Sequence, residues 1–149
     1  DLSHLNEAGF WEVATLSDAP LVATHSNAHA LTASSRNLSD RQLRAIGESG
    51  GMVGLNFATC FLRPDGRESA EMTLDPVKAH IDHLLKLAGE DHVGLGSDFD
   101  GATTPAPMGG VEGLPVLIQA MREMGLGEAL VAKIAHENWV RLLQRTWGG

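Results

Sequence analysis

The chain has 149 residues, 43% hydrophobic and 20% charged, a composition typical of a single globular domain with a sizeable core. Its net charge of −8 argues against a partner with a phosphate backbone, so we expect no nucleic acid partner. No apolar run approaches the roughly 18 residues of a membrane span, so we expect none, and the single cysteine, Cys60, excludes a disulfide within the chain.

Short β-rich runs alternate with longer amphipathic segments, a pattern typical of βα units on a parallel sheet. Four runs are predicted as strands: a stub that ends at His4, and the segments 20–26, 51–58 and 92–100. Their nearly continuous apolar character favours parallel strands that are buried on both faces. The sequence therefore predicts an α/β fold.

Capping residues predict where the helices between these strands begin. Asn6 is placed to cap a helix over 7–17, and Ser39 with Gln42 three residues later has the spacing of a capping box. Asp75 followed by a proline predicts the start of a third helix, which carries one apolar stripe. His80 and His83 fall outside that stripe, so we expect both to face solvent.

After residue 110 the sequence predicts only helices. The segments 114–125, 127–138 and 139–147 have helical patterning and are expected to pack as two or three helices.

Three of the predicted strands end in a polar side chain of the kind that binds or works beside a metal. These side chains are His4, His25 and Asp98. Because the ends of parallel strands converge on one edge of a sheet, we expect the three to lie close together. Two neutral imidazoles and a carboxylate near a metal-bound water suit a hydrolytic zinc site, although each histidine alone could equally be a hydrogen-bonded structural residue.

Four separated motifs occur in an order and spacing that resembles a known family. They are "DLSHLN", "ATHSNAHALTASSRNLSDRQL", "GGMVGLNF" and "HVGLGSDFDG". Together they are similar to the C-terminal half of the membrane (renal-type) dipeptidases, peptidase family M19. The resemblance implies that residues 1–149 are the C-terminal half of a (β/α)8 TIM-like barrel with C-terminal helices, a partial domain whose N-terminal half is absent from this chain.

The resemblance also implies a role for four residues. His4 and His25 match the histidines that bind one zinc ion of a binuclear pair. Arg36 matches the arginine that pairs with the C-terminal carboxylate of the substrate, and Asp98 matches the acid/base group. The implied cofactor is therefore zinc, two ions in the intact site, and the implied substrate is a dipeptide.

We accordingly expect the parent protein to be a zinc-dependent dipeptidase. Two alternatives remain at this point: another metal-dependent barrel amidohydrolase, acting on a cyclic amide or lactone, and a non-catalytic structural fragment. The family's early H-x-D motif and bridging glutamate belong to the missing half. For the isolated chain we therefore expect one bound zinc ion or none, and no dipeptidase activity. We also expect that two half-barrels could pair as a homodimer. The family's soluble bacterial members suggest a cytoplasmic location.

Overall fold

The structure is a computed structural model that describes residues 1–148. It contains a three-stranded parallel sheet in the order β1-β2-β3, formed by β1 (Val22–Ala23), β2 (Met52–Asn56) and β3 (Val93–Ser97). Parallel neighbours that follow one another in the chain need a crossover between them, which the helices supply. The predicted α/β fold is confirmed.

The helices occupy the gaps between strands and the whole C-terminal third of the chain. Their bounds are α1 (Glu7–Leu16), α2 (Asp40–Glu48), α3 (Thr59–Leu62), α4 (Asp75–Ala88), α5 (Leu114–Glu123), α6 (Glu128–Ala132) and α7 (Asn138–Trp147). A short 3-10 helix, η1 (Val111–Gly113), precedes α5, and a π-helical segment, η2 (Lys133–Glu137), joins α6 to α7. The helices predicted after residue 110 are confirmed.

Local sequence accounts for the starts of α1 and α2. The Asn6 side chain accepts a hydrogen bond from the backbone N–H of Gly9, and Ser39 and Gln42 form the predicted capping box. In both cases a side chain satisfies backbone groups that the first turn of a helix leaves without a partner.

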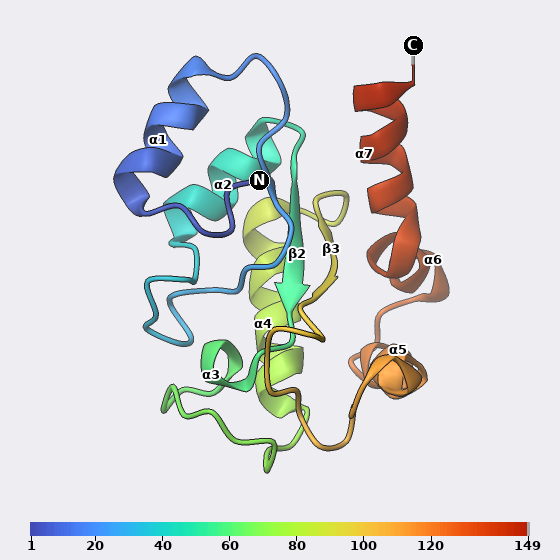
Figure 1. Cartoon of the computed structure of the whole chain (residues 1–149). Helices are drawn as coiled ribbons and strands as arrows, with labels where there is room; N and C mark the ends of the chain where they lie inside the picture. The colour runs from blue at the N-terminus through green and yellow to red at the C-terminus, as the bar shows by residue number, and fades with distance from the viewer. Residues whose placement is uncertain (149) are drawn as a thin grey trace.

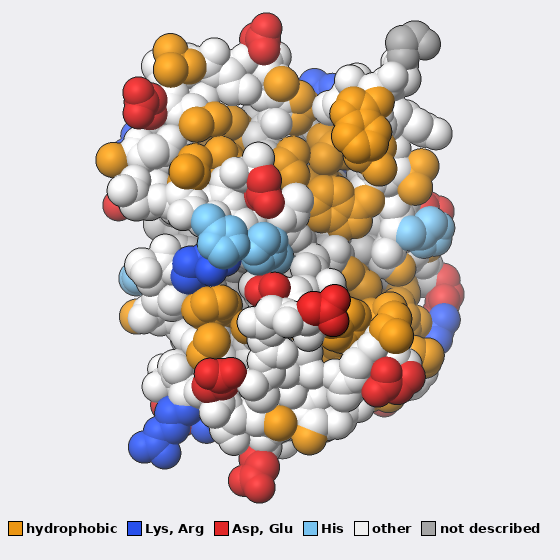
Figure 2. All heavy atoms as spheres, in the orientation of Figure 1, with side chains coloured by type: hydrophobic (Ala, Val, Ile, Leu, Met, Phe, Trp, Pro, Cys, Tyr) orange, Lys and Arg blue, Asp and Glu red, His pale blue; other side chains and the backbone are white. Residues whose placement is uncertain are grey.

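Helices α2 and α4 cover one face of the sheet and contact each other behind it (Figure 1). Four of the five residues predicted for the apolar stripe of α4 are buried, Val77, Ile81, Leu84 and Ala88, and the fifth, Leu85, is partly buried. The opposite face is turned towards the viewer in Figure 1, and Figure 2 shows apolar side chains gathered on it around a central polar group.

The C-terminal helices are fixed to the edge of β3 by two side chains. The amide of Asn138 donates to the carbonyls of Glu90 and Val93, each at 2.8 Å, and the indole N–H of Trp139 donates to Leu95 O at 3.0 Å. The carbonyls of Val93 and Leu95 on this edge of β3 are therefore bonded to side chains, because no further strand among the described residues pairs with β3.

Two strand predictions were wrong in extent. The stub that ends at His4 is a turn, with one backbone hydrogen bond to the sheet, from Leu2 N–H to Val22 O at 2.8 Å. The next ladder donor, the N–H of Thr24, instead donates to the Asp1 carboxylate, so pairing stops there. The strand predicted over 20–26 is reduced to Val22–Ala23, because at Thr24 the backbone leaves the ladder and passes over Gly54 and Gly96.

The prediction that His80 faces solvent was also wrong. His80 is fully buried, with Nδ1 accepting from the N–H of Ala28 and Nε2 lying 3.2 Å from the carbonyl oxygen of Leu62. His83 is only partly exposed, because its Nε2 lies 2.8 Å from Asp40 Oδ1 on α2. Helical periodicity could not anticipate either contact, since both partners come from segments more than 15 residues away in the chain.

Asp75 does not cap α4 as predicted. The helix begins at Asp75 itself, Leu74 takes the N-cap position, and no side chain within the described residues caps it. The hydroxyl of Thr73 accepts from the N–H of Asp75 instead. Finally, within residues 1–148 no helix is long and apolar enough to cross a membrane.

Candidate metal centre

The predicted site residues meet where β1, β2 and β3 end. After β1 the backbone crosses the open face of the sheet at Thr24, directly over Gly54 of β2 and Gly96 of β3. A Cβ atom at either glycine would collide with the Thr24 carbonyl oxygen. The two glycines therefore permit a close backbone approach that brings His25 beside the end of β2, where its carbonyl oxygen lies 3.4 Å from Asn56 Nδ2.

His4 and His25 form the centre of the site. Their Nε2 atoms lie 3.0 Å apart, and their rings meet edge to face with centroids 5.1 Å apart. The two imidazoles come from segments 21 residues apart in the chain, one from the turn before α1 and the other from the loop after β1. The structure thus brings together the two histidines that the sequence singled out.

The imidazole pair fits a divalent metal ion. Two nitrogens bound to one tetrahedral zinc at 2.0–2.1 Å lie about 3.3 Å apart, close to the spacing of this pair. Partial burial lowers the pKa of the His25 imidazole, and the nearby Asp98 carboxylate opposes part of this shift. A lowered pKa favours the neutral imidazole, which is the form that binds metal.

The ligand set is nevertheless incomplete. Within residues 1–148, no group of three or more His, Cys, Asp or Glu side chains is placed to hold a metal ion. Structural and catalytic zinc sites use at least three protein ligands. The imidazole pair by itself is therefore short of a complete zinc ligand set among the described residues.

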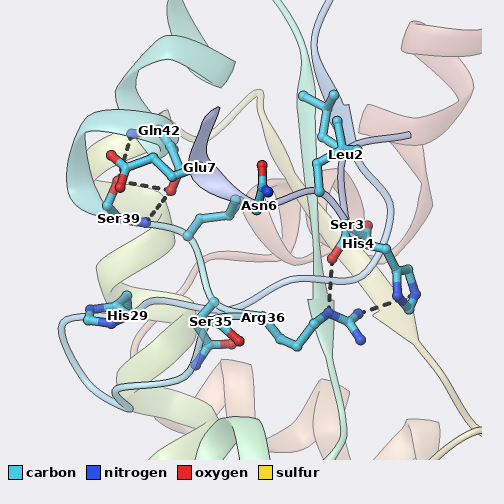
Figure 3. A pocket seen from close by; sticks show the side chains of 13 residues that line it. Leu2, Ser3, His4, Asn6, Glu7, His29, Ser35, Arg36, Ser39 and Gln42 are labelled. Atoms are coloured by element: carbon cyan, nitrogen blue, oxygen red, sulfur yellow. Dashed lines mark hydrogen bonds between the residues drawn. The ribbon is translucent and has the colours of Figure 1, made fainter. Parts of the chain in front are cut away.

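Arg36 lies against the imidazole pair. Its Nε–H donates to the carbonyl of Ser3 at 3.1 Å, and its Nη2 lies 3.3 Å from His4 Nε2 (Figure 3). The guanidinium carbon is 5.3 Å from the ring centroid of Phe61. The guanidinium is held on one edge by protein contacts, and its position beside the histidines suits recognition of a carboxylate next to a metal.

A pocket of about 380 Å³ opens beside Arg36. Its walls come from the chain start, the segment 35–39 and Gln42, and His29 lines its far side (Figure 3). His29, an exposed residue, is thus the only other histidine besides His4 among the residues that line this pocket.

Asp98 occupies the end of β3 in an unusual backbone conformation. Ser97 and Asp98 have φ angles of 40° and 70°, a left-handed region that non-glycine residues rarely adopt and that is often found at functional sites. The Asp98 carboxylate accepts a hydrogen bond from Asn56 Nδ2 at 3.1 Å. Asp100, two residues on, is exposed.

Asn56 is a site residue that sequence reasoning missed. It is buried at the end of β2, and its amide lies within 3.4 Å of the carbonyl oxygen of His25 as well as binding Asp98. It thereby links the loop after β1 to the loop after β3. The available signal was a polar residue inside the otherwise apolar run 51–58, at the position where β2 ends.

Comparison with known proteins agrees with this geometry. The family described as membrane dipeptidase (peptidase family M19) matches residues 1–147. The chain is 66% identical to a crystal structure of dipeptidase AC, a metallopeptidase of family M19, with a TM-score of 0.98 over 100% of this chain and 44% of that one.

Two further relatives show the same pattern of coverage. A metallopeptidase from Rhodobacter sphaeroides, solved with a phosphinate mimic of the dipeptide L-Ala-D-Ala, is 67% identical, with a TM-score of 0.97 over 99% of this chain and 42% of that one. An uncharacterized protein encoded in the pqqA 5′ region of Klebsiella pneumoniae is 52% identical over 99% of this chain and 54% of its own length. The chain thus spans about half the length of these relatives.

Proposed function

The chain belongs to the membrane dipeptidase family, peptidase family M19, and we propose that the protein of which it is part is a zinc-dependent dipeptidase with a binuclear metal centre. The observation that carries this proposal is the meeting of His4, His25, Arg36 and Asp98 at one edge of the sheet. In this proposal the sheet is part of a (β/α)8 barrel, whose remaining strands and metal ligands lie outside this chain. The 42–44% coverage of the two crystal structures supports it.

His4 and His25 would hold one of the zinc ions. When bound, the metal pair would polarise the scissile carbonyl and lower the pKa of a bound water. The chain's own contribution is two imidazoles whose Nε2 atoms lie 3.0 Å apart.

Arg36 would bind the C-terminal carboxylate of the substrate through its guanidinium. Its contact with His4, at 3.3 Å, supports a substrate in which that carboxylate is one residue from the scissile carbonyl. One residue spans at most about 3.3–3.6 Å, so a carboxylate on Arg36 would place the last peptide bond of the substrate, and no more distant one, at the histidines. The dipeptide mimic held by the R. sphaeroides relative supports a dipeptide as that substrate.

Asp98 would take a proton from the attacking water and return it to the leaving amine. The Asn56 amide donates to its carboxylate at 3.1 Å and would hold it in place for this role. Acid–base catalysis of this kind contributes about 10²–10⁴-fold to the rate.

The test uses the full-length protein that contains this chain. Asp98→Asn should lower kcat for dipeptides by about 10²-fold or more, because the amide cannot take a proton. Zinc content, measured by mass spectrometry of the metal, should stay that of the wild type. Asp100→Asn, which alters the exposed neighbouring carboxylate, should retain activity.

Two results would contradict the proposal. The first is an unchanged kcat in Asp98→Asn. The second is a wild-type protein that hydrolyses lactones or cyclic amides but no dipeptide, which would favour the amidohydrolase alternative.

A further inference from the structure

The Asp1 carboxylate is surrounded by hydrogen-bond donors. Its Oδ1 accepts from the N–H and hydroxyl of Ser3 at 3.1 and 2.8 Å, and from the N–H of Thr24 at 3.1 Å. Its Oδ2 lies 2.6 Å from the Thr24 hydroxyl. Since a carboxylate has no hydrogen to donate, the Thr24 hydroxyl must be the donor in this last contact.

The direction of that bond fixes the hydrogen on His25. The Thr24 hydroxyl also lies 2.7 Å from His25 Nδ1. A hydroxyl has only one hydrogen, and the one on Thr24 is directed at Asp1, so its oxygen must accept from the imidazole. His25 therefore carries its hydrogen on Nδ1, and the Nε2 lone pair points at His4.

Ser3 completes the arrangement. Its hydroxyl donates to Asp1 and accepts from the backbone N–H of His25 at 3.0 Å, so the backbone of His25 is tied to the same carboxylate as its ring. Both the position and the tautomer of His25 depend on the group formed by Asp1, Ser3 and Thr24.

We infer that Thr24, oriented by Asp1, is a positioning residue that holds His25 in the Nδ1–H tautomer and so makes its Nε2 a metal ligand. This inference rests on the proposed function for the metal-binding role of His25. Ligating histidines commonly donate their second ring N–H to a fixed acceptor, and loss of such a partner costs about 10–100-fold in metal affinity.

The experiment compares Thr24→Val with Thr24→Ser in the full-length protein. Valine keeps the shape of threonine but removes the hydroxyl, whereas serine keeps the hydroxyl. Zinc affinity, measured by competition with a chromogenic chelator, should fall about 10–100-fold in Thr24→Val and stay near the wild-type value in Thr24→Ser. Circular dichroism checks that each variant is folded.

A second readout follows the tautomer directly. In the metal-free protein, the ¹⁵N chemical shifts of the His25 ring should report Nδ1–H in the wild type and in Thr24→Ser. In Thr24→Val they should report a mixture or the Nε2–H form. A folded Thr24→Val that binds zinc like the wild type and keeps Nδ1–H would overturn the inference.

Separate results test the zinc-dependent function and the role of Thr24 in setting the His25 tautomer. A wild-type protein that binds no zinc would contradict the zinc-dependent function. The ring nitrogen shifts would still show whether Thr24 sets the tautomer, and an unchanged tautomer in Thr24→Val would exclude the positioning role by itself.

Discussion

The Arg36 side chain is held in place by contacts with Ser3 and Phe61, which suits its proposed role in binding a carboxylate. Its Nε–H is fixed by the carbonyl of Ser3, and the ring of Phe61 lies 5.3 Å from the guanidinium carbon. These contacts restrict the rotamers of a long side chain before a carboxylate arrives, which lowers the entropy lost on binding. The half-buried position also strengthens the charge-assisted hydrogen bonds that a carboxylate would form.

Arg36→Ala should raise KM chiefly for dipeptides that carry a free C-terminal carboxylate. A hydrogen bond to a charged group contributes about 1.5–3 kcal/mol, so the expected increase is about 10–100-fold. Steady-state kinetics with matched free and C-terminally amidated dipeptides measures the difference. Arg41→Ala is a suitable control, because Arg41 lies 4.0 Å over the ring of Trp11 and outside the site. An equal loss with both kinds of substrate would exclude the carboxylate contact.

At the scale of elements, the site depends on how the loop after β1 is carried across the sheet. Thr24 passes over Gly54 and Gly96, and Ser26 N–H donates to Gly54 O at 2.8 Å. The crossing ends β1 after two residues and presents His25 to His4. Because β1 ends after two residues, the chain is free to carry His25 to its contact with His4.

Gly54→Ala should disturb this crossing. The added methyl group would meet the Thr24 carbonyl oxygen, and such overpacking against backbone costs about 1–3 kcal/mol. We expect a lower melting temperature and weaker zinc binding, measured by calorimetry and chelator competition. Gly127→Ala is the matched control, because its φ of −67° suits alanine and no atom lies within 4 Å of the new Cβ. Wild-type zinc affinity in Gly54→Ala would show that the crossing tolerates a side chain.

His80 joins the segment that carries Arg36 to helix α4. Its Nδ1 accepts from Ala28 N–H, its Nε2 lies near the Thr32 hydroxyl and Leu62 O, and burial lowers its pKa to about 4. A histidine with a pKa below its unfolded value of about 6.5 is protonated more readily in the unfolded chain. Its contribution to stability is therefore complete above pH 6.5 and is lost as the pH falls towards 4.

Between pH 7 and pH 5 this effect amounts to about 2 kcal/mol in the free energy of unfolding. Urea denaturation of the wild type and of His80→Gln at both pH values should show the two differing more at pH 7 than at pH 5, by about that amount. His136→Gln, at an exposed position, should show no such change relative to the wild type. A constant difference between wild type and His80→Gln at the two pH values would contradict a depressed His80 pKa.

At the scale of the whole molecule, the chain exposes apolar surface on α7 and on the open face of the sheet. Val140, Leu143 and Trp147 on α7 are 47%, 40% and 80% exposed, and they lie at positions that share one face of a helix. Figure 2 shows further apolar side chains on the open face around the site. Contiguous apolar surface of this kind favours association.

The 149-residue chain expressed alone should therefore self-associate, bind zinc weakly and hydrolyse no dipeptide. Sedimentation equilibrium should give a mass above that of one chain, and the chelator assay should give a weaker zinc affinity than for the full-length protein. The full-length protein, assayed in parallel, is the control. A monomeric and active isolated chain would contradict the proposal that ligands outside this chain complete the site.

Local sequence was enough for features that depend on near neighbours. The cap at Asn6, the Ser39 capping box and the stripe of α4 involve residues within one or a few helical turns, so their patterns identified them. The polar strand ends identified His25 and Asp98, because parallel strands deliver their last side chains to one edge whatever surrounds them. His4 was identified in the same way, although its segment is a turn.

Other features depend on partners far away in the chain, and only the tertiary structure decided them. His80 became a buried residue because Ala28 and Leu62 reach it, and the first stub failed as a strand because Asp1 took the donor that would have continued the ladder. Asn56 joined the site through contacts with residues 31 and 42 positions away. Residue type and periodicity determined which side chains could form the site. Three-dimensional packing decided which hydrogen bonds orient these side chains, because their hydrogen-bond partners lie at no fixed spacing in the sequence.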